Sequence, residues 1–333
     1  MIQKIIYLFF SILIFSFSFL GCKYEREDNK KQLPNIVWLV AEDQSPEFFP
    51  IYGDSTVKLP FIESLAKDAI VFNNAYTPAP VCAPARSAII TGLYPTTLGT
   101  HNMRTYNSYK KENEPTIGIP SYSPIVPKGV KMFPQYLRKI GYYTSNNSKE
   151  DYNFKKTDGV WDDSSSNAHW KNRAAGQPFF AVFNFGISHE SQIWEQGDND
   201  ILVDQKLVQI PPYFPDTHEI RKDIAVNYSN LIRLDKKIGK IINELKQEGL
   251  YEKSIIFFYS DHGGPFPRHK RSLYETGIKV PLVIKFPYSK YGGTENNNFI
   301  SFIDYAPSIL SLAGIKPPNV MQGKAQFGKF KVN

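Results

Sequence analysis

The sequence predicts an α/β fold in which a mostly parallel central sheet carries helices on both faces. Three observations lead to this prediction: continuous apolar runs, amphipathic helical segments, and the alternation of the two along the chain. The 333 residues are 42% hydrophobic and 14% aromatic, so the chain can bury a large core and is not expected to be disordered. In such sheets, ligands bind beyond the carboxyl ends of the strands, where functional residues are therefore expected.

Strands are predicted where apolar residues run nearly without interruption, as in strands buried on both faces. The runs are NIVWLVA (35–41), IVFNNAY (70–76), YYTSN (142–146), PFFAVFNFG (178–186), SIIFFYS (254–260) and VPLVIKF (280–286). Helices are predicted at LPFIESLAKDA (59–69), MFPQYLRKIG (132–141), 221–250 and DYAPSILSLAG (304–314). Pro60 suits the first turn of the earliest helix, and apolar spacings of three, four or seven make 221–250 the longest one.

The N-terminal residues predict export. A basic start and an apolar run end at Gly21-Cys22, which is typical of a secretory signal over residues 1–21 and resembles a bacterial lipobox. Cys22 is then the expected lipidation site, and 22–34 a charged tether. The protein is therefore expected at a bacterial membrane, facing the periplasm or at the cell surface. The alternative for this segment is an uncleaved membrane anchor.

Net charge limits the class of substrate that is expected, and the number of cysteines limits the disulfides. The formal net charge of +7 suits an anionic substrate without naming it, and no nucleic-acid partner is predicted. The chain has two cysteines, and with Cys22 assigned to the anchor, Cys82 remains alone in the domain. No intramolecular disulfide is therefore expected, although an exported protein could form one.

Polar residues follow three of the predicted strands. Glu42 and Asp43 come after the first, Asp261 and His262 after the fifth, and Ser-His-Glu (188–190) after the fourth. Two adjacent acids at a strand end repel each other unless a cation or a basic group neutralises them, and carboxylate oxygens suit calcium or magnesium. The alternative for each acid alone is a helix cap or a turn residue.

The segment PVCAPARSAIITG (80–92) holds the isolated cysteine. Pro84 can begin a helix, which places Cys82 near an N-terminus whose N–H groups favour an anion. Arg86 on the first turn can add a planar guanidinium that fits sulfate or phosphate oxygens. The alternatives are a buried free cysteine and a thiolate nucleophile.

This segment resembles the sulfatase signature, Cys-x-Pro-x-Arg followed by Thr-Gly, here Cys82, Pro84, Arg86, Thr91 and Gly92. NIVWLVAED upstream and SDHGG downstream resemble the two metal-binding strand ends of that family. The similarity covers about 35–327. YYTSNNSKEDYNF, AHWKNR and FNFGISHES are most similar to bacterial relatives of heparan N-sulfatase, which act on sulfated sugars.

The resemblance implies an alkaline phosphatase-like fold and a set of roles for named residues. A formylglycine-generating or anaerobic sulfatase-maturing enzyme would oxidise Cys82 to formylglycine, which is then the nucleophile. Calcium, with magnesium as the alternative, would be held by Glu42, Asp43, Cys82, Asp261 and His262. The catalytic set would be Cys82, Arg86, Lys149, His189 and Lys270, with His189 as the proton donor, and His101 and Arg104 would face the sugar. Asp151 is the candidate for a role beside Lys149, because the sequence around Lys149 departs from the pattern of other branches.

The implied substrate is a sulfated polysaccharide or oligosaccharide, cut at an O- or N-sulfate. Residues 35–316 are expected to form the catalytic domain, and 317–333 to be a linker toward a smaller C-terminal sheet domain that is missing. A chain without that domain is expected to expose apolar surface. Two other functions stay open: a phosphonate or phosphate monoester hydrolase, suggested by His262, and an inactive truncated surface protein that binds anionic glycan.

Overall fold

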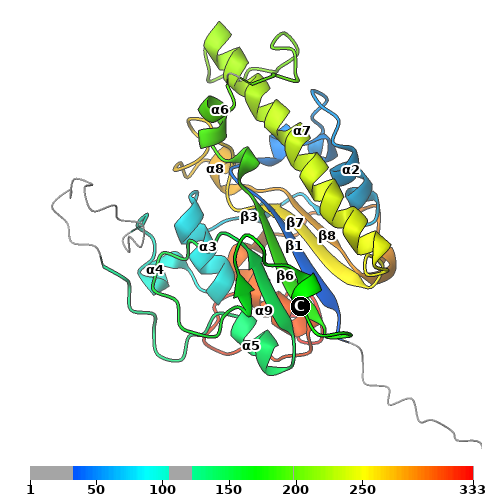
Figure 1. Cartoon of the computed structure of the whole chain (residues 1–333). Helices are drawn as coiled ribbons and strands as arrows, with labels where there is room; N and C mark the ends of the chain where they lie inside the picture. The colour runs from blue at the N-terminus through cyan, green and yellow to red at the C-terminus, as the bar shows by residue number, and fades with distance from the viewer. Residues whose placement is uncertain (1–32, 105–121, 198, 333) are drawn as a thin grey trace, which may run out of the picture. The chain divides into compact units, whose positions relative to one another are not determined.

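The computed structural model describes residues 33–104, 122–197 and 199–332, which form an α/β fold around an eight-stranded sheet (Figure 1). The strand order is β5-β4-β6-β1-β7-β8-β2-β9. The bounds are β1 Asn35–Ala41, β2 Ile70–Phe72, β4 Tyr143–Asn147, β5 Asp163–Ser164, β6 Phe179–Phe185, β7 Ser254–Ser260, β8 Leu282–Lys285 and β9 Thr294–Asn296. Neighbouring strands from β5 to β7 are parallel, so the predicted fold class is confirmed.

Two strand predictions differ from the structure in detail. The run 280–286 forms β8, which is antiparallel to both of its neighbours, β7 and β2. The run 70–76 is not one strand: after β2 the chain leaves the large sheet, and β3 (Ala75–Tyr76) pairs with β10 (Ile300–Ser301) in a second, two-stranded sheet. Asn73 and Asn74 separate the two strands, in agreement with the low strand propensity of asparagine.

The helices lie between the strands in the order that the sequence predicts, with short additional turns. The α-helices are α2 Pro60–Lys67, α3 Cys82–Thr91, α4 Pro95–Leu98, α5 Pro134–Lys139, α6 Ser191–Glu195, α7 His218–Gln247, α8 Glu275–Ile278 and α9 Tyr305–Leu312. The 3-10 helices are η1 Pro46–Phe48, η2 Pro50–Tyr52, η3 Trp170–Asn172, η4 Gly186–Ser188, η5 Pro287–Ser289 and η6 Phe302–Asp304. Thr217 caps α7, since its hydroxyl accepts the Ile220 N–H at 3.4 Å.

Successive residues of the central strand β1 face opposite layers of the core. Val37 and Leu39 belong to the cluster that includes α2 and α7. Trp38 points the other way, and its ring centroid lies 5.4 Å from that of Phe133 and 6.1 Å from that of Tyr305 on α9. Figure 1 shows α2 and α7 on one side of the strands and α3, α5 and α9 on the other. This two-sided burial explains why β1 reads as an uninterrupted apolar run.

A buried carboxylate joins α7 to α2. Asp235 of α7 accepts the backbone N–H groups of Ile62 at 2.8 Å and Phe61 at 3.2 Å, which would otherwise be unpaired in the first turn of α2. The two helices pass so closely that a Cβ atom at Gly239 would lie 2.5 Å from the Phe61 ring. Asp235 thus caps a neighbouring helix from the middle of its own.

We expect Asp235→Ala to lower the free energy of unfolding by about 1–3 kcal/mol, because two buried N–H groups lose their acceptor. Burial raises the pKa of Asp235 from about 3.8 to about 6. Between these values the folded protein binds the proton more tightly than the unfolded chain does, so the stability from this group falls as pH rises through that window. Asp235→Asn retains an acceptor and removes the titration. Urea unfolding at several pH values measures the free energy of unfolding of the wild type and of the Ala and Asn variants. The Asn variant should lose the dependence of this free energy on pH but little of its size. Equal dependence on pH in all three proteins would contradict the assignment.

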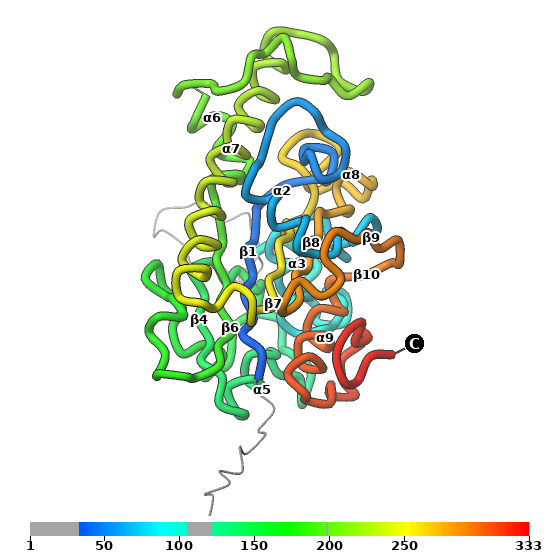
Figure 2. The backbone as a smooth tube through the Cα atoms, turned by 90° about the vertical axis from the view of Figure 1, so that its right-hand side faces the viewer, coloured from blue at the N-terminus to red at the C-terminus, as the bar shows by residue number. Residues whose placement is uncertain are grey.

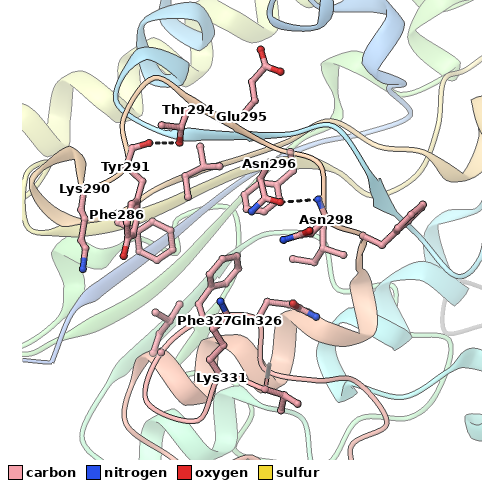
Figure 3. A pocket seen from close by; sticks show the side chains of 17 residues that line it. Phe286, Lys290, Tyr291, Thr294, Glu295, Asn296, Asn298, Gln326, Phe327 and Lys331 are labelled. Carbon is pink, nitrogen blue, oxygen red and sulfur yellow. Dashed lines mark hydrogen bonds between the residues drawn. The ribbon is translucent and has the colours of Figure 1, made fainter.

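A groove of about 890 Å³ with a mixed polar and apolar lining lies along the outer edge of the sheet (Figure 3). Phe286, Tyr291 and Phe327 line it, and Phe299 and Val332 at its margin are 74% and 50% exposed. Figure 2 shows the C-terminal segment beside α9 and near β9 and β10. The expected missing C-terminal domain and the domain boundaries at that end stay predictions.

The proposed leader, the lipidation site Cys22 and most of the tether lie outside the described residues, so these assignments stay predictions. Within the part of the chain that the structure describes, none of the helices has the length and apolar content to cross a membrane.

Candidate active site

The site residues lie at one edge of the sheet, where three adjacent parallel strands end. β1 lies between β6 and β7, and Ala41 pairs in register with Phe185 and with Ser260. The residues that follow these strands therefore meet, although they are distant in sequence. The backbone N–H of Glu42 donates to Ser188 Oγ at 3.0 Å, and that of Asp43 to the carboxylate of the residue after β7 at 3.3 Å. Burial at these strand ends makes each unpaired polar group costly.

Cys82 is the first residue of α3 and is fully buried. Its Sγ lies 3.2 Å from His262 Nε2 and 4.0 Å from Asp43 Oδ1. The α3 N-terminus directs backbone N–H groups and the positive end of the helix dipole toward this point. Although burial opposes it, the neighbouring His262 lowers the pKa of the Cys82 thiol. The expected position of the cysteine at a helix N-terminus is confirmed.

Asp43 is the most strongly paired carboxylate of the site. It is fully buried; Oδ2 accepts from Lys270 Nζ at 2.7 Å and from the Glu190 N–H at 2.7 Å, and Oδ1 lies 3.0 Å from His262 Nε2. Burial alone would raise the pKa of Asp43, but the charges of His262 and Lys270 hold it well below its usual range. In turn Asp261 and Asp43 raise the pKa of His262 well above its ordinary value, against the effect of burial.

Arg86 connects α3 to two strand ends. Its Nε donates to Asp261 Oδ2 at 3.1 Å and its Nη1 to Asn184 Oδ1 at 2.6 Å. Its Nη2 is buried and has no hydrogen-bond partner among the described residues, and Glu42 Oε1 lies 3.7 Å away. Burial opposes the charge of Asp261, but His262 and Arg86 lower the pKa of that carboxyl to about 2. Nη2 thus has an ion-pair neighbour in Glu42 but, within the described part of the chain, an unused hydrogen-bond donor.

Glu42 and Asp43 use different cationic partners. Glu42 Oε2 binds Lys149 Nζ at 2.7 Å, and its other oxygen faces Arg86, whereas Asp43 binds Lys270. The expected repulsion between the two acids is therefore relieved by separate basic side chains. Glu42 is also outside the sets of side chains close enough to share one metal ion, so its assignment as a metal ligand stays a prediction.

His189 and Lys270 meet on the open side of the cluster. His189 Nε2 lies 3.1 Å from Lys270 Nζ and 3.8 Å from Asp43 Oδ2, while Nδ1 is 3.1 Å from Ser191 Oγ. A hydrogen bond to Cys82 and the charge of Asp43 raise the pKa of His189, against the effect of burial. Its side chain is 25% exposed, so a ligand can reach it from solvent.

The two residues expected to face a sugar lie farther out. His101 is exposed, and Arg104 is half exposed and pairs with Asp151 at 3.3 Å. Asp151 is two residues from Lys149 on the same loop, and Arg104 reaches it from a different loop. The role of Asp151 beside Lys149 and the sugar contacts of His101 and Arg104 stay predictions.

Two residues of the site received no role from the sequence. Glu190 pairs with Lys270 at 2.9 Å, and its two oxygens accept hydrogen bonds from the Arg271 guanidinium at 2.7 and 2.6 Å. Asn184 holds the Arg86 guanidinium. Glu190 directly follows His189, so its sequence position could have indicated a role in the site. Asn184 lies inside an apolar strand, and its polarity among aromatic residues is the sequence feature that could have indicated its role.

The residues present fit a divalent cation. Two sets of side chains have ligand atoms within 4.8 Å of one another: Asp43, Cys82 and His189, and Cys82, Asp261 and His262. Their shared residue is Cys82, and the sets add two buried carboxylates. Hard cations such as calcium and magnesium prefer such oxygens. A metal bound through His262 needs a neutral imidazole, so binding would release the proton that the two carboxylates hold there.

Comparison with known proteins agrees with this geometry. The sulfatase family model matches residues 34–315. An ulvan-active sulfatase of Formosa agariphila is 40% identical over 97% of this chain and 61% of its own length. The N-sulphoglucosamine sulphohydrolase of Homo sapiens is 27% identical over 86% of this chain and 62% of its own length. The chain thus spans less than two thirds of these relatives.

Solved structures share the fold at low identity. A Bacteroides thetaiotaomicron protein from the metabolism of multiple glycosaminoglycans aligns with a TM-score of 0.67 and 18% identity, over 88% of this chain and 75% of its own. The phosphonate monoester hydrolase of Agrobacterium radiobacter aligns with a TM-score of 0.61 and 14% identity, over 89% of this chain and 79% of its own. The family match covers most of the chain and includes the strand ends and the cysteine helix described above, so the chain belongs to the sulfatase family.

Proposed function

We propose that this protein is a sulfatase that hydrolyses the sulfate esters or N-sulfates of a sulfated polysaccharide or its oligosaccharides. The observation that carries this proposal is Cys82, buried at the N-terminus of α3 and 3.2 Å from His262, in a chain of the sulfatase family. Lysine and arginine side chains around it supply positive charge for a sulfate group. The named relatives support a sulfated sugar as the substrate class.

In this proposal Cys82 acts after a maturing enzyme has oxidised it to formylglycine. One hydroxyl of the hydrated aldehyde gives its proton to water, and its oxygen attacks sulfur. The bond from sulfur to the sugar oxygen or nitrogen breaks, and His189 gives its proton to that leaving atom. The second hydroxyl then loses its proton to water, the aldehyde carbonyl re-forms, sulfate departs, and a water molecule hydrates the aldehyde again. A thiol or an ordinary hydroxyl lacks this second step.

The charged side chains hold the sulfate while its bond breaks. Lys149, Lys270 and Nη2 of Arg86, which has no hydrogen-bond partner among the described residues, are donors for the sulfate oxygens. In the structure Lys149 pairs with Glu42 and Lys270 with Asp43. Donors fixed in place before the reaction lower the barrier without reorganising. A calcium or magnesium ion held by Asp43, Asp261 and His262 would supply further positive charge for the sulfate.

Cys82 variants test the mechanism. Protein co-expressed with a formylglycine-generating enzyme should turn over aryl sulfate in proportion to the converted fraction, measured by peptide mass around residue 82. Cys82→Ala should be inactive. Cys82→Ser should stop after one turnover, since its sulfate ester must wait for water.

Three outcomes would overturn the proposal. Unconverted protein that works as well as converted protein would exclude formylglycine as the nucleophile. Converted protein that hydrolyses aryl phosphate or phosphonate faster than aryl sulfate would assign the site to the related ester hydrolases, and converted protein without turnover of either would favour a glycan-binding role.

The proposal includes export and lipidation at Cys22, which the sequence supports through its lipobox-like segment. Metabolic labelling with a fatty-acid analogue should mark the wild type and leave Cys22→Ser unmarked.

A further inference from the structure

A fully buried histidine, His269, lies next to Lys270 in the chain and takes no part in the proposed chemistry. Both of its ring nitrogens have partners: Nδ1 is 3.2 Å from Ser45 Oγ, and Nε2 is 2.9 Å from the Tyr213 hydroxyl. The ring also stacks on Phe48, at 5.8 Å between centroids. Such complete pairing in a buried position indicates a fixed ring.

The hydrogen bonds of Ser45 determine which ring nitrogen of His269 carries the proton. The Ser45 hydroxyl donates its one hydrogen to the Thr276 carbonyl at 2.6 Å and accepts the Gly264 N–H at 2.7 Å. Its remaining lone pair can only accept, so His269 Nδ1 must be the donor. His269 Nε2 faces the Tyr213 hydroxyl at 2.9 Å and Glu47 Oε1 at 3.5 Å. Burial lowers the pKa of His269 to about 4, so the ring is neutral at ordinary pH and Nε2 accepts from the Tyr213 hydroxyl.

This arrangement ties together the loops that carry the site. Ser45 follows the acidic end of β1, and Gly264 follows the acidic end of β7. The Lys270 backbone N–H donates to the Gly264 carbonyl at 3.0 Å, and a Cβ at Gly264 would lie 2.6 Å from His269 Nδ1. Only glycine therefore lets the loops approach this closely. The Lys270 ammonium then reaches Asp43 at 2.7 Å.

We propose that His269 is a positioning residue for sulfate binding: by donating from Nδ1 to Ser45, it places the Lys270 ammonium at Asp43. The role given to Lys270 rests on the proposed function. The placement itself depends only on the contacts of the loops, so the two can be tested separately.

Two amide substitutions separate the ring nitrogens. In His269→Asn the amide nitrogen can take the place of Nδ1 and donate to Ser45. In His269→Gln the longer side chain carries its amide toward the place of Nε2. We expect the Asn variant to keep kcat/KM on aryl sulfate within about threefold, and the Gln and Ala variants to lose about 10- to 100-fold, as small misplacements of a binding group do. Tyr213→Phe, which removes only the Nε2 partner, should behave like the Asn variant.

A double-mutant cycle distinguishes positioning from a general loss of structure. If His269 acts through Lys270, His269→Ala should cost little further activity in a Lys270→Met protein. Fully additive losses would overturn the proposal. His169→Ala, a change to a partly exposed histidine that pairs with Glu244, is the matched control and should leave kcat/KM unchanged.

A second readout does not need turnover. The rate at which an amine-reactive ester acylates Lys270, measured by peptide mass against the exposed Lys253, reports the placement of the ammonium. We expect Lys270 to react about tenfold faster in the Gln and Ala variants than in the wild type, and at the wild-type rate in the Asn variant. Equal rates in the Asn, Gln and Ala variants would overturn the proposal. If the converted wild type hydrolyses no sulfate ester, the proposed function is wrong. The acylation rates of Lys270 still test the positioning role of His269, because they do not depend on turnover.

Discussion

Asp43→Asn is expected to lower kcat/KM on sulfate esters by about 100- to 1,000-fold, which is the scale of a lost electrostatic contact in an active site. The carboxylate is fully buried and contacts Lys270, His262 and the Glu190 N–H, so the substitution removes one of the two carboxylates that pair with the buried Lys270 ammonium and leaves Glu190 as the other. Because one carboxylate remains, we expect the free energy of unfolding to fall by less than the loss of about 3–5 kcal/mol that a fully uncompensated buried charge causes. Activity, metal content and thermal unfolding, measured on the same sample, separate these effects.

Asp216→Asn is the matched control for this substitution. Asp216 is 59% exposed and pairs with Arg221 at the surface, where an ion pair contributes about 0–1 kcal/mol. Full metal occupancy and wild-type activity in Asp43→Asn would contradict the assignment of Asp43 to the metal and to the site.

His189→Ala should reduce kcat on sulfated sugars by about 100- to 10,000-fold, the range of a general acid. A sugar hydroxyl is a poor leaving group and needs the proton, whereas an activated aryl oxide departs without one. The loss on a nitrophenyl sulfate should therefore be at least tenfold smaller, an effect of about 1.4 kcal/mol on the barrier.

The exposed His218, at the first position of α7, provides the control substitution to alanine. Equal losses on the sugar and the aryl substrate would show that His189 binds sulfate together with Lys270 and does not protonate the leaving atom.

The sheet could be predicted because its central strands are buried on both faces, so that β1, β6 and β7 carry almost no polar residues before their ends. The orientation of β8 could not be predicted, since a short buried strand has the same composition in either direction. The break between β2 and β3 could not be predicted either, because it depends on the strand with which each half pairs. β10, the partner of β3, lies more than 200 residues away in the sequence.

The same limit applies to the site. Its acids could be predicted because charged residues directly after buried strands are unusual. The division of partners, with Lys149 on Glu42 and Lys270 on Asp43, depends on side-chain directions that a sequence does not contain. The Ser45–His269 contact joins positions 224 apart and involves two ordinary residue types, so no local pattern indicated it.

The order in which the chain is synthesised bears on the burial of Cys82. α3 packs against η6 and α9, which begin about 220 residues after the cysteine. At a synthesis rate of roughly 5–20 residues per second, the cysteine stays without this cover for on the order of ten to forty seconds. In the proposed maturation of Cys82, a modifying enzyme would compete with the arrival of α9, and we expect slower translation between residues 82 and 312 to raise the yield of converted protein.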